Sequence, residues 1–553
     1  MSILAPVAAV FLLQGCIQET FPEGGALTAG QVDGAENSLV GKVNALTSAL
    51  MSSGTAGYSS LYGTQVDFGL PAIHIMTEAM LEDLAIAGNV QAFQFYMFSY
   101  NLGQNDTEWP IAYFWDCYYA WIKLANDIIA EIDPQTDDEE EQGYLGIAYA
   151  YRAMFYLDLA RMYEFKPNGY TSVPDDVLGL TVPIVTEKTT EEESTFNPRV
   201  PREDMYTFIM SDLDKAAGFL KDRTYSYSRP TLGAVYGLYA RAWLEKGYWT
   251  EDGDESAFRE AARYARLSID TSHKTPLTQD EWEDPQTGFN SGASNNSWIW
   301  GLTVSSEMLA NLLAFNAHLC SEALWGYCYH SNPSASVSFY NNIDDKDFRK
   351  HSWLDPKRFD YYDYKLAGTE TEQDYFLNGN EEMQISPARN YQTIKFRPVG
   401  GEMMDYVSGN PADHPLMRVE EMYFIEMEAT AHYDLGQART LLNSFMRYRV
   451  TDGSYNCDPR TADLDSFINE MFFQKRVEFW GEGVLFFDYK RLDKGITRHY
   501  TGTNHPSIWQ FNTDGRSPQW NIVIGRGEFQ SNTAINDSNN NPSPAGALTV
   551  PQS

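Results

Sequence analysis

Apolar residues recur at every third or fourth position over several long stretches of the chain, which is the pattern of amphipathic helices. In the clearest stretch, residues 113–132, six apolar side chains share one helical face: Phe114, Tyr118, Trp121, Ala125, Ile128 and Ile132. Further helices are predicted at residues 143–163, 203–220, 232–247, 257–269, 417–435, 438–449 and 467–487. Because short polar links join the paired helices, we expect antiparallel helical hairpins.

Small residues stand where neighbouring helices would cross closely. They are Ala125, Ala150, Ala153, Ala240, Ala242, Ala429 and Ala431. The mixture of these alanines with large aromatic side chains is similar to that of tetratricopeptide (TPR) helix pairs. The period is not strict, so we predict TPR-like packing and not a regular repeat array.

The chain changes character at about residues 271–415 and 501–553. Both stretches are rich in Gly, Asn, Ser, Pro, Asp and aromatic residues, and helical periodicity survives only around residues 307–319. Loops of this length are usually functional or disordered, and the aromatic residues argue against disorder. The predicted fold class is mainly α. A single domain over 32–553 would hold a scaffold of helical hairpins (about 32–270 and 416–500) and a loop-rich lobe with few short strands.

The first 31 residues are interpreted as a targeting segment and a tether. A short apolar run at 3–13 fits a secretory signal and ends at Leu13-Gln14-Gly15-Cys16, which resembles a bacterial lipobox with Cys16 as the acylated residue. Gln14 is an unusual residue at its position, and no Lys or Arg occurs among the first fifteen residues. The alternative is that Cys16 is an ordinary cysteine after a cleaved signal. Residues 17–31 are expected to form a flexible tether.

Charge and composition narrow the range of ligands. The formal net charge is −36, from 40 basic and 76 acidic residues, and such a field repels nucleic acids and anionic head groups. We therefore expect no nucleic-acid partner, although an acidic surface also serves simply to keep a protein soluble. Aromatic residues make up 14% of the chain, which favours a surface on which a ligand stacks.

The sequence carries none of the common motifs of hydrolases, phosphate-binding loops or zinc sites. The sequence has no HExxH, GxSxG, phosphate-binding glycine loop or zinc-ligand spacing. His74, His318 and His432 fall in amphipathic helical stretches, where a packing role is expected. Among the cysteines, Cys117 is expected to be a buried free thiol, and whether Cys320 pairs with Cys328 is left open.

Acidic clusters allow two further interpretations. A close carboxylate pair among Asp355, Asp360 and Asp363 would allow glycoside hydrolysis, but nothing separates these residues from a solvated acidic loop. Asp344, Asp345 and Asp347 could hold calcium, yet their spacing does not match an EF-hand, and a solvated turn is the preferred interpretation. No cofactor is predicted, and a structural calcium is not indicated.

Four segments of the chain resemble the SusD/RagB-like family, in the order and with the spacing of the family. Residues 417–449 read MRVEEMYFIEMEATAHYDLGQARTLLNSFMRYR, and residues 475–491 read KRVEFWGEGVLFFDYKR. Residues 115–126 (WDCYYAWIKLAN) and the helix at 146–163 are similar to two further family helices. Lys475, Trp480 and Val484 depart from the family pattern but leave the predicted helix intact. Arg476, Glu478, Glu482 and Arg491 of these motifs are interpreted as structural ion pairs.

The resemblance implies a TPR-like helical frame with a loop-rich face and a role without catalysis. It also implies a lipid-anchored protein on the outer face of a Gram-negative outer membrane. Such a protein acts as a lid on a SusC-like TonB-dependent transporter and binds glycan for import. A member of the same scaffold that binds peptides is the main alternative, and a glycoside hydrolase is the other.

Two aromatic and amide-rich loops are predicted to contact the glycan, because sugars stack on rings and hydrogen-bond to amides. The predicted contact residues are Asn105 and Trp109 in one loop (99–110), Trp325, Tyr327, Tyr329 and Asn332 in the other (325–332), and, less strongly supported, Tyr58 and Tyr62. For each ring the alternative is that it packs beneath its own loop. Trp298 and Trp300 are interpreted as parts of a short buried strand at 297–302, and Trp282 as a packing residue.

Overall fold

The computed structural model describes residues 38–51, 66–86, 105–107, 109–309, 311–357, 364–378 and 390–548. Within these ranges the protein is mainly helical, with two sheets of two short strands each. Cys16, the tether 17–31, Tyr58 and Tyr62 lie outside the described residues. Inside them, none of the helices combines the length and the apolar content that crossing a membrane requires.

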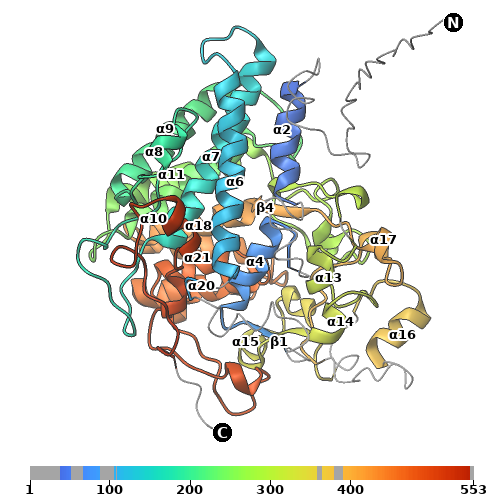
Figure 1. Ribbon diagram of the computed structural model, residues 1–553. Coiled ribbons are helices and arrows are strands. Elements are labelled where there is room, and N and C mark those ends of the chain that lie inside the picture. The colour runs from blue at the N-terminus through green and yellow to red at the C-terminus, as the bar shows by residue number, and fades with distance from the viewer. Residues whose placement is uncertain are drawn as a thin grey trace, which may run out of the picture.

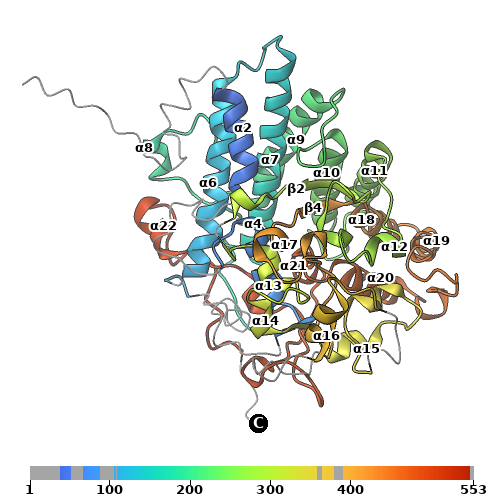
Figure 2. The ribbon, with the colours of Figure 1, turned by 90° about the vertical axis from the view of Figure 1, so that its right-hand side faces the viewer.

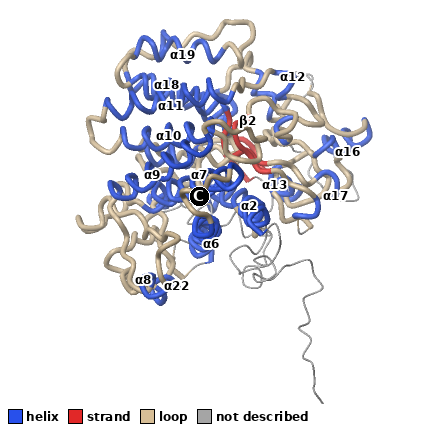
Figure 3. The backbone as a smooth tube through the Cα atoms, turned by 90° about the horizontal axis from the view of Figure 1, so that it is seen from above, coloured by secondary structure: helices blue, strands red, loops and turns tan. Residues whose placement is uncertain are grey.

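Seven helices lie one against the next and form what we call the helical stack (Figures 1 and 3). In order they are α6 (Trp109–Glu131), α7 (Glu139–Tyr163), α9 (Arg202–Leu220), α10 (Leu232–Gly247), α11 (Glu255–Ser272), α18 (Val419–Ala431) and α19 (Leu435–Met446). Each pair of neighbours packs at close range, and the seven alanines predicted at helix crossings are all buried. The predicted TPR-like packing is therefore confirmed.

Local sequence explains where these helices begin. At the start of α7 the Asp138 carboxylate accepts hydrogen bonds from the backbone N–H groups of Glu140 and Glu141, and acidic residues fill the first turn. Asp254 caps α11 in the same way. Such caps satisfy N–H groups that have no partner within the helix, and acidic side chains suit its positive end. These two helices begin a few residues before their predicted starts at 143 and 257, because the caps precede the first apolar position.

The single helix predicted at 467–487 is wrong. The structure has α20 (Leu464–Phe479) and α21 (Leu485–Arg491), separated by Gly481 and Gly483 with φ of 80° and 74°. Left-handed backbone suits glycine, since a side chain there would crowd the backbone. Both glycine N–H groups donate to the buried Glu78 carboxylate of α4 (Leu70–Ala79), at 3.0 and 3.3 Å. The chain therefore turns back on α4 instead of continuing the helix.

Four short strands form two antiparallel pairs. Strand β2 (Trp298–Leu302) pairs with β4 (His414–Arg418), and β1 (Leu84–Ile86) pairs with β3 (Pro333–Ala335). All five residues of β2 are buried, as predicted, and Trp282 is buried too. The helix predicted from residue 417 begins at Val419 because its first two residues belong to β4. Since β4 leads directly into α18, its pairing with β2 ties the irregular part of the chain to the stack.

The described residues between 273 and 413 form an irregular region, which we call the lobe. Its short helices are α12 (Gln279–Trp282), α13 (Phe315–Leu319), α14 (Cys328–Ser331), α15 (Val337–Asn342), α16 (Glu370–Asn378) and α17 (Tyr406–Gly409). Figure 1 shows most of them on the right of the stack. The helical periodicity at 307–319 yields a 3₁₀ turn at Ser306–Met308 and α13 instead of one helix, because Asn311 between them has a left-handed φ of 57°.

A cluster of buried charges holds the lobe to the helices. The Glu478 carboxylate of α20 pairs with three arginines at 2.8–3.2 Å: Arg349, Arg418 and Arg449. Glu482 pairs with Arg418 and with Lys395 of the lobe. All of these side chains are 2% exposed or less. Arg476 pairs with Glu82 and Asp83, and Arg491 pairs with Glu428 and Asp488. The motif charges are therefore structural, as predicted.

Candidate ligand-binding surface

Apolar side chains gather on the surface at α17. Met404, Tyr406 and Val407 are 60%, 41% and 53% exposed, which is high for large apolar residues in the described part of the chain. Trp325 lies next to α17. Gly409 is the last residue of that helix, and a Cβ added to it would stand 3.1 Å from the ring of Trp325. We call Trp325, Met404, Tyr406 and Val407 the α17 patch. Exposed apolar side chains that lie together often mark a binding surface, whereas single exposed apolar residues do not.

Trp325 is half-buried, and its lower part packs on the small buried cluster of Cys320, Ala323 and Cys328. The Nε1–H group of the indole is buried and has no hydrogen-bond partner among the described residues. Nearby, the Asn410 side chain donates to the carbonyl of Asn311 at 3.1 Å, while its own Oδ1 is buried with no partner in the described ranges. Buried polar groups without partners are uncommon in folded proteins, so these two call for water or a ligand.

Backbone turns hold α17 in place. The Glu402 carboxylate accepts hydrogen bonds from the N–H groups of Met404 and Asp405 at 2.9 and 3.0 Å. The Asp405 carboxylate accepts from the Ser408 hydroxyl and the Val407 N–H, and these bonds lower the pKa of Asp405. The patch therefore sits on a turn that is fixed by its own side chains, which favours a preformed surface over one that must be ordered on binding.

The ring of Tyr327 packs against the core. Its half-buried ring stacks on His318 with centroids 4.6 Å apart, and His318 stacks in turn on Phe68 at 5.2 Å. Burial raises the pKa of the Tyr327 hydroxyl. His318 thus packs in the core as expected, as does His432, whose ring stacks on Phe258 at 3.6 Å. Contact between Tyr327 and a ligand remains a prediction.

The second half of this predicted loop is helical. Tyr329 belongs to α14, and Asn332 ends that helix in the left-handed conformation with φ of 49°. The Asn332 Oδ1 accepts a hydrogen bond from the Gln392 side chain at 3.2 Å. The side chain of Tyr329 lies outside the described part of the structure. The prediction of a continuous loop at 325–332 is therefore wrong, because four residues there close a turn of helix.

The other predicted loop lies at the beginning of α6. Asn105 is exposed, whereas Trp109 is the first residue of α6 and not part of a loop, since Pro110 suits the first turn of a helix. The side chain of Trp109 is not among those described. Asp106 pairs with Arg526 of α22 (Arg526–Ser531), which Figure 2 shows beside the lower end of α6. The described contacts of this loop share no residue with those of Trp325.

The acidic residues and cysteines considered as possible functional groups take part in packing, hydrogen bonds or ion pairs where the structure describes them. Asp355 is buried and accepts a hydrogen bond from Tyr340 at 2.8 Å, whereas Asp360 and Asp363 lie outside the described residues. In the second cluster, Asp345 pairs with Lys350 and Asp347 pairs with Arg349, while Asp344 accepts a hydrogen bond from the Lys346 N–H. No group of three or more metal-ligating side chains occurs within the described ranges. Cys117, Cys320 and Cys328 are buried free thiols, so the Cys320–Cys328 disulfide does not form.

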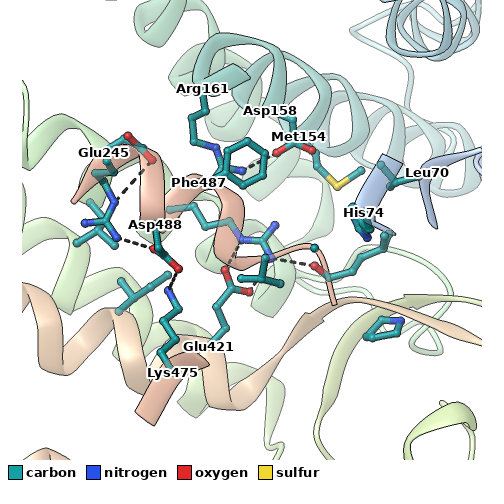
Figure 4. Close-up of a pocket in the computed structure, with 18 residues that line it drawn as sticks. Leu70, His74, Met154, Asp158, Arg161, Glu245, Glu421, Lys475, Phe487 and Asp488 are labelled. Carbon is teal, nitrogen blue, oxygen red and sulfur yellow. Dashed lines mark hydrogen bonds and ion pairs between the residues drawn. The ribbon is translucent and has the colours of Figure 1, made fainter. Parts of the chain in front are cut away.

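A cavity of about 40 Å³ lies deep between α4, α7, α10, α18 and α21 (Figure 4). Its walls carry ion pairs, namely Arg161 with Asp158, Arg241 with Glu421, and Lys475 with Asp488. This volume holds a few water molecules but no sugar ring. The charges around it already have partners, so we assign the cavity a structural role and look for the ligand on the surface.

Buried histidines predict a loss of stability in acid. Beside this cavity the Nδ1 atom of His74 lies 2.9 Å from the Nε2 atom of His414. Burial lowers the pKa of His74 and of His505 to about 3, and the pKa of His432 to about 4. Their unfolded pKa is about 6.5, so the unfolded chain binds more protons below that pH, and stability falls as pH drops from about 6.5 toward 3. Burial raises the pKa of Glu78 to about 8. Glu78 therefore contributes stability that is lost as pH rises through about 8, which is the opposite pH dependence to that of the histidines.

We expect the urea midpoint to fall between pH 7 and pH 4.5, and His432→Gln to flatten that dependence. The Gln side chain does not titrate, so it removes one of the protonation steps that favour the unfolded chain. Equilibrium unfolding followed by circular dichroism at both pH values measures the effect. A midpoint that rises on acidification would contradict the expected sign.

Comparisons with known proteins identify the family. A family model described as "Starch-binding associating with outer membrane" matches residues 47–244, and the model of the SusD family matches residues 222–541, more than half of the chain. The chain belongs to the SusD family. A relative, SusD-like protein P2 of Formosa agariphila, is 22% identical over 406 residues, which cover 71% of this chain and 74% of the relative.

Solved structures of SusD relatives share the fold. A SusD-like carbohydrate binding protein from Bacteroides vulgatus aligns with a TM-score of 0.67 and 19% identity, covering 90% of this chain and 97% of that protein. A SusD superfamily protein from Bacteroides thetaiotaomicron aligns with a TM-score of 0.63 and 18% identity, covering 91% and 99%. Membership of the SusD family thus supports carbohydrate binding and association with the outer membrane at the level of the family.

Proposed function

We propose that this SusD-family protein captures oligosaccharides at the cell surface and passes them to a TonB-dependent transporter without breaking their bonds. The observation that carries the proposal is the α17 patch: an exposed set of ring and apolar side chains on a fixed turn of the lobe. The flat C–H faces of sugars bind to such surfaces, and their hydroxyls bind to nearby amides. The starch-binding description of the matching family model supports the same class of ligand.

Two polar atoms beside the patch suit a sugar. The Trp325 Nε1–H can donate to a hydroxyl oxygen, and the Asn410 Oδ1 can accept from a hydroxyl. Both are buried without a partner among the described residues. A water molecule that bridges either atom to a sugar hydroxyl would remove the free-energy cost of leaving that atom unpaired. Asn105, Trp109, Tyr327, Tyr329, Asn332, Tyr58 and Tyr62 remain proposed further contacts.

The anchor and the partner belong to the same proposal. Acylation of Cys16 would hold the protein on the outer face of the outer membrane, and several acyl chains make such anchoring durable. A SusC-like transporter beneath it would receive the captured glycan. The absence of catalysis is supported by the carboxylates of the family motifs, because Glu478 and Glu482 are buried in ion pairs and not available to a glycosidic bond.

We expect Trp325→Ala to weaken glycan binding at least about tenfold, because an indole that stacks on a ligand is a typical binding hot spot. Retardation of the purified protein in gels containing the bound glycan measures the affinity. Phe196→Ala is the matched control, since Phe196 is 69% exposed on another part of the surface. Trp109→Ala tests the other predicted loop in the same assay. Unchanged affinity of both tryptophan variants, with unaltered circular dichroism, would refute the site.

A further inference from the structure

An open groove of about 870 Å³ lies where three helices of the stack end or begin. Its walls are the link between α9 and α10 (221–231), the first turn of α10, the end of α11 (271–274) and the lobe residues 292–296. This volume falls in the range of sites that enclose small ligands. No residue of the groove belongs to the α17 patch, so it is a separate surface.

The groove carries positive charge that the protein leaves unneutralised. Lys221, Arg223 and Lys274 line it, and none of the three has a carboxylate within ion-pair distance among the described residues. Asp222, which is exposed, is the only acidic residue of the lining. In a chain with 76 acidic residues and 40 basic ones, most cations of the described part have acidic partners, so three unpaired cations in one groove stand out.

Hydrogen-bond donors occur in residues that line the groove. Asn295 is 5% exposed and lines the groove; its Oδ1 accepts from the Ser297 N–H, while its Nδ2 is buried without a partner in the described ranges. The first turn of α10 also lines the groove, and the side chain of its N-cap, Thr231, makes no capping hydrogen bond. An uncapped helix N-terminus offers free N–H groups and the positive end of the helix dipole to an anion.

Two tyrosines give the groove flat faces. Tyr227 is wedged in place: its ring meets Trp298 edge-on at 6.1 Å, and its hydroxyl donates to Asp413 at 2.7 Å. A Cβ on Gly292 would stand 2.3 Å from the Tyr227 ring, so only glycine allows this approach. Tyr225, two residues earlier, is half-buried beneath the guanidinium of Arg229. Rings held in this way suit stacking on a sugar.

We propose that this groove binds an anionic saccharide, one that carries a carboxylate or a sulfate on its sugar ring. The cations and the donors at α10 would take the charged group, the Asn295 amide would donate to a ring substituent, and the tyrosines would stack on the sugar face. The net charge of −36 does not forbid this. At physiological salt, charges beyond about 8 Å are largely screened, whereas the groove cations would contact the ligand directly.

The three cations also stabilise helix ends, whereas the unpartnered donors of Asn295 and of the first turn of α10 have no such structural role. Lys221 and Arg223 follow the end of α9, and Lys274 follows the end of α11, where positive charge is favourable. The Arg223 guanidinium donates to the Phe219 carbonyl at the last turn of α9. Helix capping of this kind explains neither the unpartnered amide of Asn295 nor the uncapped start of α10, and both belong to residues that line the groove.

Titration calorimetry with trigalacturonate, a sulfated trisaccharide, maltotriose and inorganic sulfate tests the proposal. The protein is the Trp325→Ala variant, which removes the proposed neutral-glycan site and so separates the two proposals. At least one of the acidic trisaccharides should bind at least about tenfold more tightly than maltotriose and than inorganic sulfate. Lys274→Gln combined with Arg223→Gln should abolish that preference, while Lys188→Gln, which removes one positive charge at an exposed turn away from the groove lining, should leave it unchanged.

Equal affinity for acidic and neutral trisaccharides would overturn the proposal, as would binding of inorganic sulfate that matches the oligosaccharides. Lys221→Gln is a second test that does not depend on folding, because Lys221 is exposed, and it should weaken the acidic ligand by at least about threefold. If both the double variant and Lys221→Gln bind as the parent does, the groove is not the site.

Discussion

Replacing Glu478 by glutamine should lower the free energy of unfolding by about 3–5 kcal/mol, because removal of one partner leaves buried charges unpaired. Glu478 contacts Arg349, Arg418 and Arg449, and each of these side chains is 1% exposed or less. The three arginines are the cause of a lowered pKa of Glu478, since they favour its ionised form. Equilibrium unfolding in urea at pH 7 measures the loss.

Glu255→Gln on the surface of α11 is the matched control. Glu255 pairs with Arg259 at 2.7 Å, one turn along the helix, and both side chains are more than half exposed. An exposed pair of this kind contributes about 0.3–0.5 kcal/mol. If Glu478→Gln costs no more than Glu255→Gln, the buried cluster does not hold the lobe to the helices, and our account of the fold fails at that point.

Gly483→Ala should destabilise the protein by about 2–5 kcal/mol, from two causes. The φ of 74° is unfavourable for alanine by about 1–2 kcal/mol, and the new Cβ would stand 2.4 Å from the Cβ of His74, so packing must shift at a cost of about 1–3 kcal/mol. The thermal midpoint and the urea midpoint report this loss.

Gly453→Ala separates these two causes. Gly453 has a similar φ of 70°, but a Cβ there would meet no atom within 4 Å. Its substitution should therefore cost only the backbone part, about 1–2 kcal/mol. Equal costs for the two variants would mean that the close approach of Gly483 to α4 does not exist in solution.

The long helices could be predicted from the sequence because their apolar period is a local signal. The break between α20 and α21 could not, since Phe472, Phe479 and Phe486 continue one apolar face through it. What ends α20 is the Glu78 carboxylate, which binds the N–H groups of Gly481 and Gly483 from about 400 residues away. Gly481 and Gly483 are the local signal of the break, but a hydrogen bond over that separation adds no further pattern to the sequence around it.

The ion pairs could be predicted in kind but not in partner. Helical spacing marked Glu478 and Glu482 as paired charges, yet their partners Arg349 and Lys395 come from the lobe, where no periodicity points to them. Charges buried by a distant segment look identical in sequence to charges on a solvated surface. The structure is therefore needed to show that these residues fasten the lobe to the helices.

The candidate site was predicted in part. Trp325 lies on the exposed patch, but Tyr327, only two residues away, packs on His318, and the sequence has no means of separating the two. Met404, Tyr406 and Val407 were missed. Their signal was present: large apolar residues between Gly401 and Gly409, in a stretch without helical period, are hard to bury. The groove between α9, α10 and α11 could not be predicted from the sequence, since its residues come from four separate segments.

We propose above all that the protein binds glycans and leaves them intact. The most direct test runs the purified protein through gels containing a panel of glycans, and incubates it with the same glycans before an assay for new reducing ends. We expect retardation by at least one glycan and no increase in reducing ends over a heated control. Release of reducing sugars, or no retardation by any glycan of the panel, would contradict the account.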